Sequence, residues 1–127
     1  MSKKNDAIAL SKKDFILFNQ GKYAESEVCS RRLVELDPTN ADYHCNLGVS
    51  LERQGKFAEA EASTHKAIEL DPTDADHLYN LGICLSRQGK YTEAEASARK
   101  AIELNPTNEL YKLLLNLCLK AQGKPTE

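Results

Sequence analysis

The side chains best suited to metal binding or catalysis are three histidines and four cysteines, namely His44, His65, His77, Cys29, Cys45, Cys84 and Cys118. The histidines form no HExxH or CxxC…H pattern, so their spacing predicts no metal site. The cysteines contain no CxxC pair, and we expect them to be reduced, small apolar residues. The sequence also contains no nucleophile elbow, phosphate loop or paired catalytic carboxylates. These observations predict a protein that is not an enzyme and needs no cofactor.

The histidines have simpler structural interpretations. His65 follows Glu61 by four residues, as Arg31 follows Glu27, and such pairs stabilise an exposed helix face. His44 and His77 fall near the starts of predicted helices, where we expect partial exposure.

The overall composition narrows the class of protein. The chain has 127 residues, enough for one domain, and a formal net charge of −2, which does not favour nucleic acid or an anionic membrane. The N-terminus lacks the apolar run of a secretory signal, and no segment approaches the roughly 18 apolar residues of a membrane-spanning helix. A cytoplasmic location is therefore expected.

The chain is built from an internal repeat. The tripeptide Gln-Gly-Lys recurs every 34 residues, at 20–22, 54–56, 88–90 and 122–124. Pro38, Pro72 and Pro106 keep the same period. A fixed period of this length is typical of a repeat array, which presents a surface more often than a reactive centre.

Each repeat is predicted to contain two helices. In the unit 41–74, Leu47 and Leu51 have helical spacing, and Gly55 can end that helix in the left-handed conformation. A second helix is expected over 57–70, ended by Pro72.

The helix starts also carry capping signals. Thr73 or Asp74 can cap the helix that follows, and Thr39-x-x-Asp42 and Thr73-x-x-Asp76 resemble capping boxes. The predicted organisation is all-α, with seven antiparallel helices in an N-terminal tail (1–6), three repeats (7–40, 41–74 and 75–108), a capping helix (109–121) and a C-terminal tail (122–127).

The pattern resembles the tetratricopeptide repeat (TPR) from residue 7 to about 124. The second repeat carries the family's residues at Leu47-Gly48, Leu51, Ala60, Ala67 and Pro72, and the third at Leu81-Gly82, Leu85, Ala94, Ala101 and Pro106. The first repeat departs from it, with Lys13-Asp14 for Leu-Gly and Ser26 for the first alanine. The resemblance implies a right-handed superhelical solenoid in which Gly48 and Gly82 face Ala60 and Ala94, and the first helices line a concave groove.

The resemblance also implies which residues line the groove. They are an apolar row (Phe15, Val49, Ile83 and Leu117), Cys45 and Tyr79, the amides Asn46 and Asn80, and the guanidinium groups of Arg53 and Arg87. An Asn side chain can donate to and accept from a peptide backbone, and Arg can receive a carboxylate. We therefore expect a module that binds a protein or peptide segment. The alternative, that both asparagines mainly stabilise the stack, stays open.

One TPR subtype clamps the C-terminal carboxylate of heat-shock chaperones through basic and amide positions. At those positions this chain has Ser11, Phe15, Asn46, Asp76 and Asn80. Only Asn46 matches, and Asp76 would repel a carboxylate, so a chaperone-tail clamp is not expected.

The last helix carries more leucine than a terminal helix needs. Leu115, Cys118 and Leu119 can pack inward, while Leu110, Leu113, Leu114 and Leu117 form a second stripe. That stripe predicts contact with a second copy of the chain or with an apolar ligand, unless the preceding repeat covers part of it. The alternative functions are therefore a self-assembling structural protein and a holder of apolar segments like a secretion chaperone.

Overall fold

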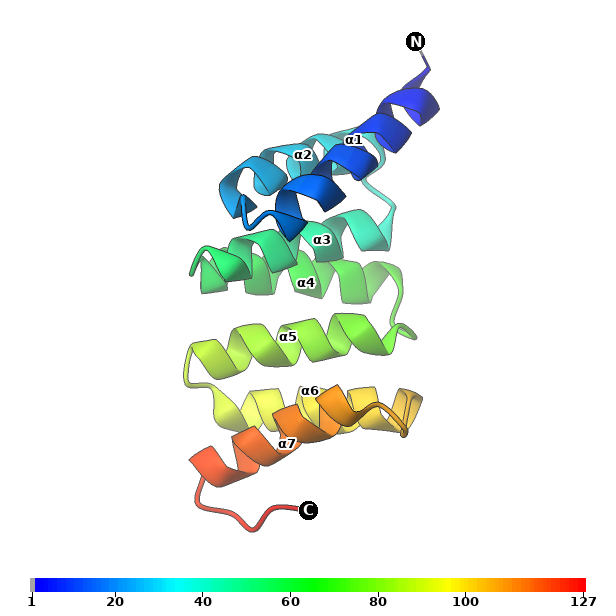
Figure 1. The fold of residues 1–127 in the computed structure, drawn as a ribbon. Helices are drawn as coiled ribbons and strands as arrows, with labels where there is room; N and C mark the ends of the chain where they lie inside the picture. The colour runs from blue at the N-terminus through cyan, green and yellow to red at the C-terminus, as the bar shows by residue number, and fades with distance from the viewer. Residues whose placement is uncertain (1) are drawn as a thin grey trace.

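The computed structural model describes residues 2–127 as a stack of seven α-helices. They are α1 (Lys3–Asn19), α2 (Tyr23–Leu36), α3 (Ala41–Arg53), α4 (Phe57–Leu70), α5 (Ala75–Arg87), α6 (Tyr91–Leu104) and α7 (Glu109–Ala121). Figure 1 shows an elongated stack from α1 and α2 to α7, with the termini at opposite ends. The predicted all-α class and seven helices are confirmed, and residues 2–127 contain no strand.

Three of the helices begin at a side-chain cap of the same kind. Asn40, Asp74 and Asn108 precede α3, α5 and α7, and each accepts a hydrogen bond from the backbone N–H two residues later. Such caps satisfy N–H groups that have no partner inside the helix.

The predicted capping boxes are wrong. The hydroxyls of Thr39 and Thr73 donate instead to Asp37 and Asp71, at 2.7 Å each, and so fix the turns around the prolines. Because the threonine hydroxyls are engaged in these local bonds, they do not cap the helices that follow. Asn40 and Asp74 cap them instead.

The glycine of each Gln-Gly-Lys ends a helix as predicted. Gly55 has a φ of 79°, and the N–H of Lys56 then reaches the Leu51 carbonyl at 3.0 Å. The other three copies have the same conformation. Glycine adopts this left-handed backbone without the steric cost that a side chain would bring.

The other two residues of Gln-Gly-Lys join neighbouring repeats. Gln54 Nε2 and Lys56 Nζ donate to the same Glu27 oxygen, at 2.9 and 3.1 Å. Gln88 and Lys90 bind Glu61 in this way, and Gln122 and Lys124 bind Glu95. We call each of these groups an inter-repeat clasp.

The clasps stabilise the ionised carboxylates. Hydrogen bonds from Arg31, then from Gln54 and Lys56, lower the pKa of Glu27 to about 2. Hydrogen bonds from Gln122, Lys124 and Arg99 likewise lower the pKa of Glu95 to about 2.

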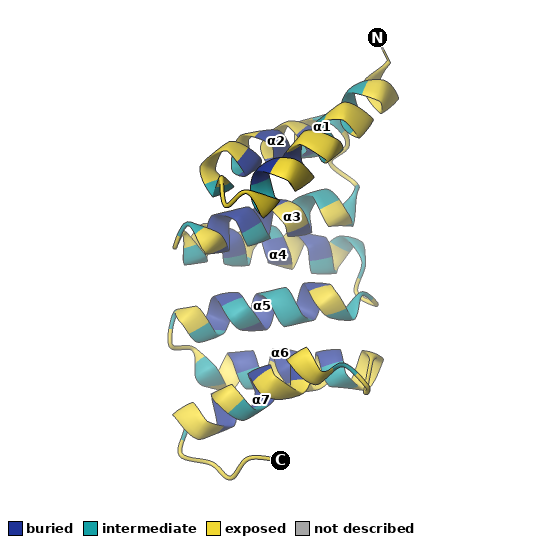
Figure 2. Ribbon diagram, viewed as in Figure 1, coloured by how far each residue is buried: buried dark blue, intermediate teal, exposed yellow. Residues whose placement is uncertain are grey.

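Buried residues occur on every helix from α1 to α7, so the core runs along the whole stack (Figure 2). A side chain at Gly48 would lie 3.2 Å from the Ala60 carbonyl oxygen and 2.6 Å from Thr64 Oγ1. At Gly82 the closest atom would be a methyl of Leu114, with the Ala94 oxygen at 3.6 Å. The predicted close approach to both alanines is therefore confirmed.

The first repeat replaces this close approach with a polar cluster. Asp14 stands where the later repeats have Gly48 and Gly82, and it is buried. Its carboxylate accepts from the hydroxyls of Ser26 and Ser30, the latter at 2.6 Å. Each buried polar atom of this cluster therefore has a partner. Residues 14 and 26 depart from the family pattern together, and their side chains bond to each other.

The chain ends are more ordered than the predicted tails. Helix α1 begins at Lys3, with Ser2 as its cap, so most of segment 1–6 is helical. At the other end, Asn116 exchanges two hydrogen bonds with the backbone of Glu127, and Arg99 pairs with the Glu127 carboxylate at 2.6 Å. The segment 122–127 therefore docks on α6 and α7.

Candidate binding groove

Three hollows follow one another along the helices that begin each repeat. The first lies between α1 and α3, the second between α3 and α5, and the third between α5 and α7. The second, of about 360 Å³, shares Val49 with the first, and Tyr79, Ile83 and Arg87 with the third. The hollows therefore form one continuous groove.

The predicted apolar row lies on this groove. Phe15 and Val49 line the first hollow, and Ile83 and Leu117 line the third. Phe15 is 70% exposed and Leu117 52% exposed, so both ends of the row are open to solvent. Val49 and Ile83 are half-buried between them. Such a row can bury apolar side chains of a bound segment.

The amides and the cysteine differ in their access to the groove. Asn46 is exposed, while Asn80 is half-buried and donates from Nδ2 to Cys45 Sγ at 3.1 Å. Cys45 is only 6% exposed, and burial raises its pKa to about 11. The prediction that Cys45 offers a groove surface is therefore wrong, since its thiol belongs to the contact between α3 and α5.

The two groove arginines already have a carboxylate partner. Glu52 is buried on α3, and its carboxylate lies 3.3 Å from Arg53 and 3.4 Å from Arg87. Glu52 was not among the groove residues that the sequence predicts. Its charge reduces the capacity of both arginines to receive a carboxylate from a ligand.

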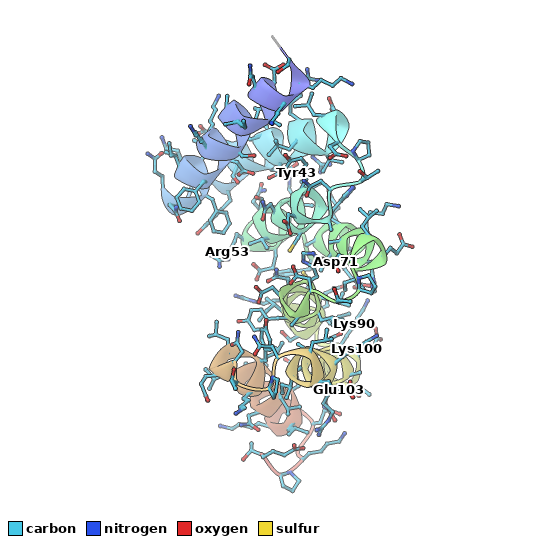
Figure 3. The ribbon with its side chains drawn as sticks, turned by 90° about the vertical axis from the view of Figure 1, so that its right-hand side faces the viewer. Tyr43, Arg53, Asp71, Lys90, Lys100 and Glu103 are labelled. Atoms are coloured by element: carbon cyan, nitrogen blue, oxygen red, sulfur yellow. The ribbon has the colours of Figure 1, made fainter. Side chains whose placement is uncertain are left out.

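Arg53 also covers two aromatic rings that sequence reasoning missed. Its guanidinium carbon lies 5.2 Å from the Phe18 ring centre and 5.7 Å from that of Tyr23. The two rings meet edge to face at 5.1 Å. In Figure 3, Arg53 lies on the opposite side of the stack from Lys100 and Glu103.

The leucines of the predicted stripe on α7 differ in their exposure. Leu110, Leu113 and Leu117 are more than half exposed and line the third hollow. Leu114 is only 4% exposed, because its side chain fills the space opposite Gly82. Part of the stripe is therefore covered by the preceding repeat, and the remaining leucines extend the groove floor.

The histidines lie outside the groove. His44 is half-buried, as predicted, with Nε2 2.8 Å from the Pro38 oxygen, and His65 lies 3.5 Å from Glu61. The predicted partial exposure of His77 is wrong, because it is only 2% exposed.

The described residues include no helix long and apolar enough to cross a membrane. Comparison with curated protein sequences gives no match.

Solved structures include TPR domains of closely similar shape. One is the first TPR of Spaghetti (RPAP3) bound to the HSP90 peptide SRMEEVD. It is 27% identical, with a TM-score of 0.88 over 93% of this chain and 94% of the other. A second is the second TPR domain of human RPAP3 with the HSP70 peptide SGPTIEEVD, at 25% identity and a TM-score of 0.87 over 92% of this chain and 98% of the other.

A third similar structure shares the fold at lower identity. The type III secretion translocator chaperone SycD of Yersinia enterocolitica is 21% identical, with a TM-score of 0.85 over 96% of this chain and 86% of the other. Family models described as tetratricopeptide repeat and TPR repeat match residues 45–109 and 16–55. The chain belongs to the tetratricopeptide repeat family.

Proposed function

We propose that this protein is a non-catalytic interaction module that binds a peptide segment along its concave groove. The observation that carries the proposal is the unbroken row of accessible apolar residues across all three hollows, from Phe15 to Leu117. Asn46 lies beside this row and is exposed, so its amide is available to a peptide backbone.

The partner is expected to be mainly apolar where it contacts the groove. The RPAP3 domains hold peptides that end in Glu-Glu-Val-Asp. In this chain the corresponding clamp positions include Ser11, Phe15 and Asp76, and the arginines beside the groove already face Glu52. An amphipathic segment that places its apolar side chains on the row fits these surroundings better than an acidic tail.

The proposal can be tested with a displayed random peptide library selected against the wild-type protein. Kd values of selected peptides are then measured for Val49→Glu/Ile83→Glu and Asn46→Ala/Asn80→Ala. We expect each pair to weaken binding at least about tenfold, since groove contacts of this kind carry about 1–2 kcal/mol or more.

Two controls accompany this experiment. Lys100→Ala/Glu103→Ala changes the opposite side of the stack and should leave Kd unchanged (Figure 3). Circular dichroism should show equal helicity for all variants. Peptides that bind the Val49→Glu/Ile83→Glu protein as tightly as the wild type would place the site elsewhere.

A second candidate function is self-association, favoured by the exposure of Leu110, Leu113 and Leu117 on α7. A homodimer through this face would also close the third hollow. The related role of holding an apolar segment, as a secretion chaperone does, uses the same leucines.

We also infer a reducing, cytoplasmic location. All four cysteines are free and buried, and each serves as a small apolar residue of the helix contacts.

A further inference from the structure

His77 is the one buried side chain of residues 2–127 whose polar atoms lack a partner. It lies in the first turn of α5, and neither ring nitrogen has a hydrogen bond. An imidazole always presents at least one donor or acceptor, and leaving it unpaired in the interior is unfavourable. Its surroundings should therefore contain a group that satisfies it.

Two carboxylates face the ring. Nε2 of His77 lies 3.6 Å from Asp74 Oδ2 and 3.9 Å from Asp42 Oδ1, both beyond good hydrogen-bond distance. The three ligand atoms all lie within 4.8 Å of one another. An ion bound at about 2.0–2.2 Å in tetrahedral geometry separates its ligands by about 3.4 Å. Asp42 is 75% exposed and can rotate to close this difference.

The next junction of the array shows what is unusual here. Tyr111 occupies the position of His77 there, and its hydroxyl donates directly to Asp76, the counterpart of Asp42. The cap of that helix is the neutral Asn108 instead of Asp74. At the His77 junction the direct bond is therefore absent and a second carboxylate is present.

We propose that His77, Asp42 and Asp74 bind a divalent first-row cation such as Zn²⁺. An imidazole nitrogen and two carboxylate oxygens are ligands that this ion accepts, with water completing the set. The ion would satisfy Nε2 of His77 and would neutralise the charges of the two carboxylates. It would also tie the first turn of α3 to that of α5 and so fix the spacing of two groove-lining helices, whether or not a peptide is bound.

The test is calorimetric titration of the tag-free protein with ZnCl₂ under reducing conditions. We expect one Zn²⁺ per chain for the wild type, with a melting temperature that rises on addition of Zn²⁺ and returns with EDTA. Asp42→Asn and Asp74→Asn should each weaken binding at least about tenfold, because each removes a charged ligand. Asp74→Asn should still cap α5, as Asn40 and Asn108 cap α3 and α7.

Further variants separate this site from other ligands. His77→Tyr introduces the residue found at Tyr43 and Tyr111, so it should fold and show no response to Zn²⁺. His44→Ala and Cys45→Ala should bind as the wild type does. In ¹⁵N spectra of the histidine rings, Zn²⁺ should shift the signals of His77 alone.

Three results would overturn the proposal. The wild type could fail to bind Zn²⁺ at millimolar concentration, which would leave the two carboxylates as the nearest charged groups to His77 and nothing more. Asp42→Asn and Asp74→Asn could bind with unchanged affinity. Binding could instead disappear only in Cys45→Ala, which would assign the metal to thiols.

Discussion

At the scale of single residues, two equivalent glycines have different neighbours. A methyl at Gly48 would meet the Ala60 backbone at 3.2 Å and Thr64 Oγ1 at 2.6 Å, whereas at Gly82 it would mainly meet a methyl of Leu114. Backbone cannot move away as a side-chain end can. Both glycines occupy the same position of the repeat, so the difference between their neighbours is visible only in the structure.

We predict that Gly48→Ala destabilises the protein by about 1–3 kcal/mol through overpacking. Gly82→Ala should cost less, because Leu114 can rotate away, while the gain of about 1 kcal/mol in helix propensity is common to both variants. Urea unfolding of the two variants measures the difference. Equal midpoints would mean that Thr64 yields as easily as Leu114.

The groove residues show the limits of position-by-position inference. Phe15, Val49 and Ile83 line the hollows at the positions that the repeat register predicts. Cys45 and Leu114 are buried, because the register states which way a side chain points and not what a neighbouring repeat places over it. Glu52 was missed for the same reason, since its role depends on Arg87 from the following repeat.

At the scale of helices, the inter-repeat clasps link stability to pH. The pKa of Glu27 lies near 2 in the folded protein, below its ordinary value of 4.5. A lowered folded-state pKa means that the clasp stabilises fully above about pH 4.5 and is lost as the pH falls toward 2.

We therefore predict that the urea midpoint is flat near neutral pH and falls between about pH 4.5 and 2. Glu27→Gln should lower the midpoint at pH 7 and reduce the slope in the acidic range. Comparing the two curves removes the contribution of the other carboxylates. Parallel curves would show that the Glu27 clasp does not contribute.

The first hairpin gives a second prediction at this scale. Asp14→Ala leaves the buried hydroxyl of Ser30 without its acceptor and leaves Ser26 with Ser50 Oγ alone, at 3.0 Å, at an expected cost of about 1–3 kcal/mol. Asp14→Gly/Ser26→Ala, which restores the residue types of the second repeat, should recover part of that loss. Thermal melts of the variants measure both effects, and additive losses would contradict a coupled cluster.

At the scale of the whole molecule, the number and order of helices follow from the 34-residue period, because each repeat can bury its apolar face only against its neighbours. The period does not determine how the chain ends. Asn116 sits where Gly48 and Gly82 sit in earlier repeats, and it binds the backbone of Glu127. Such contacts lie outside the repeat rule, so the period alone does not predict how the segment 122–127 docks on the last helices.

The exposed leucines of α7 provide the prediction for the assembled state. If they mediate self-association, sedimentation velocity should show a dimer whose fraction rises with concentration, and Leu113→Glu/Leu117→Glu should be monomeric. Leu114→Glu is the contrasting variant. The side chain of Leu114 is buried, so a charged residue in its place should lower the stability of the fold. If the wild type stays monomeric at high concentration, these leucines do not mediate self-association and serve only as part of the groove floor.

The repetition of the clasp also has a mechanical consequence. The helices contact mainly their immediate neighbours, and the termini lie at opposite ends of the stack (Figure 1). A force applied between the two ends is therefore transmitted through each contact between neighbouring repeats in turn. The contact with the lowest stiffness extends first. A peptide bound along the groove spans several junctions at once and acts in parallel with them. Ligand binding would thus stiffen the array, and stretching the array would strain the ligand.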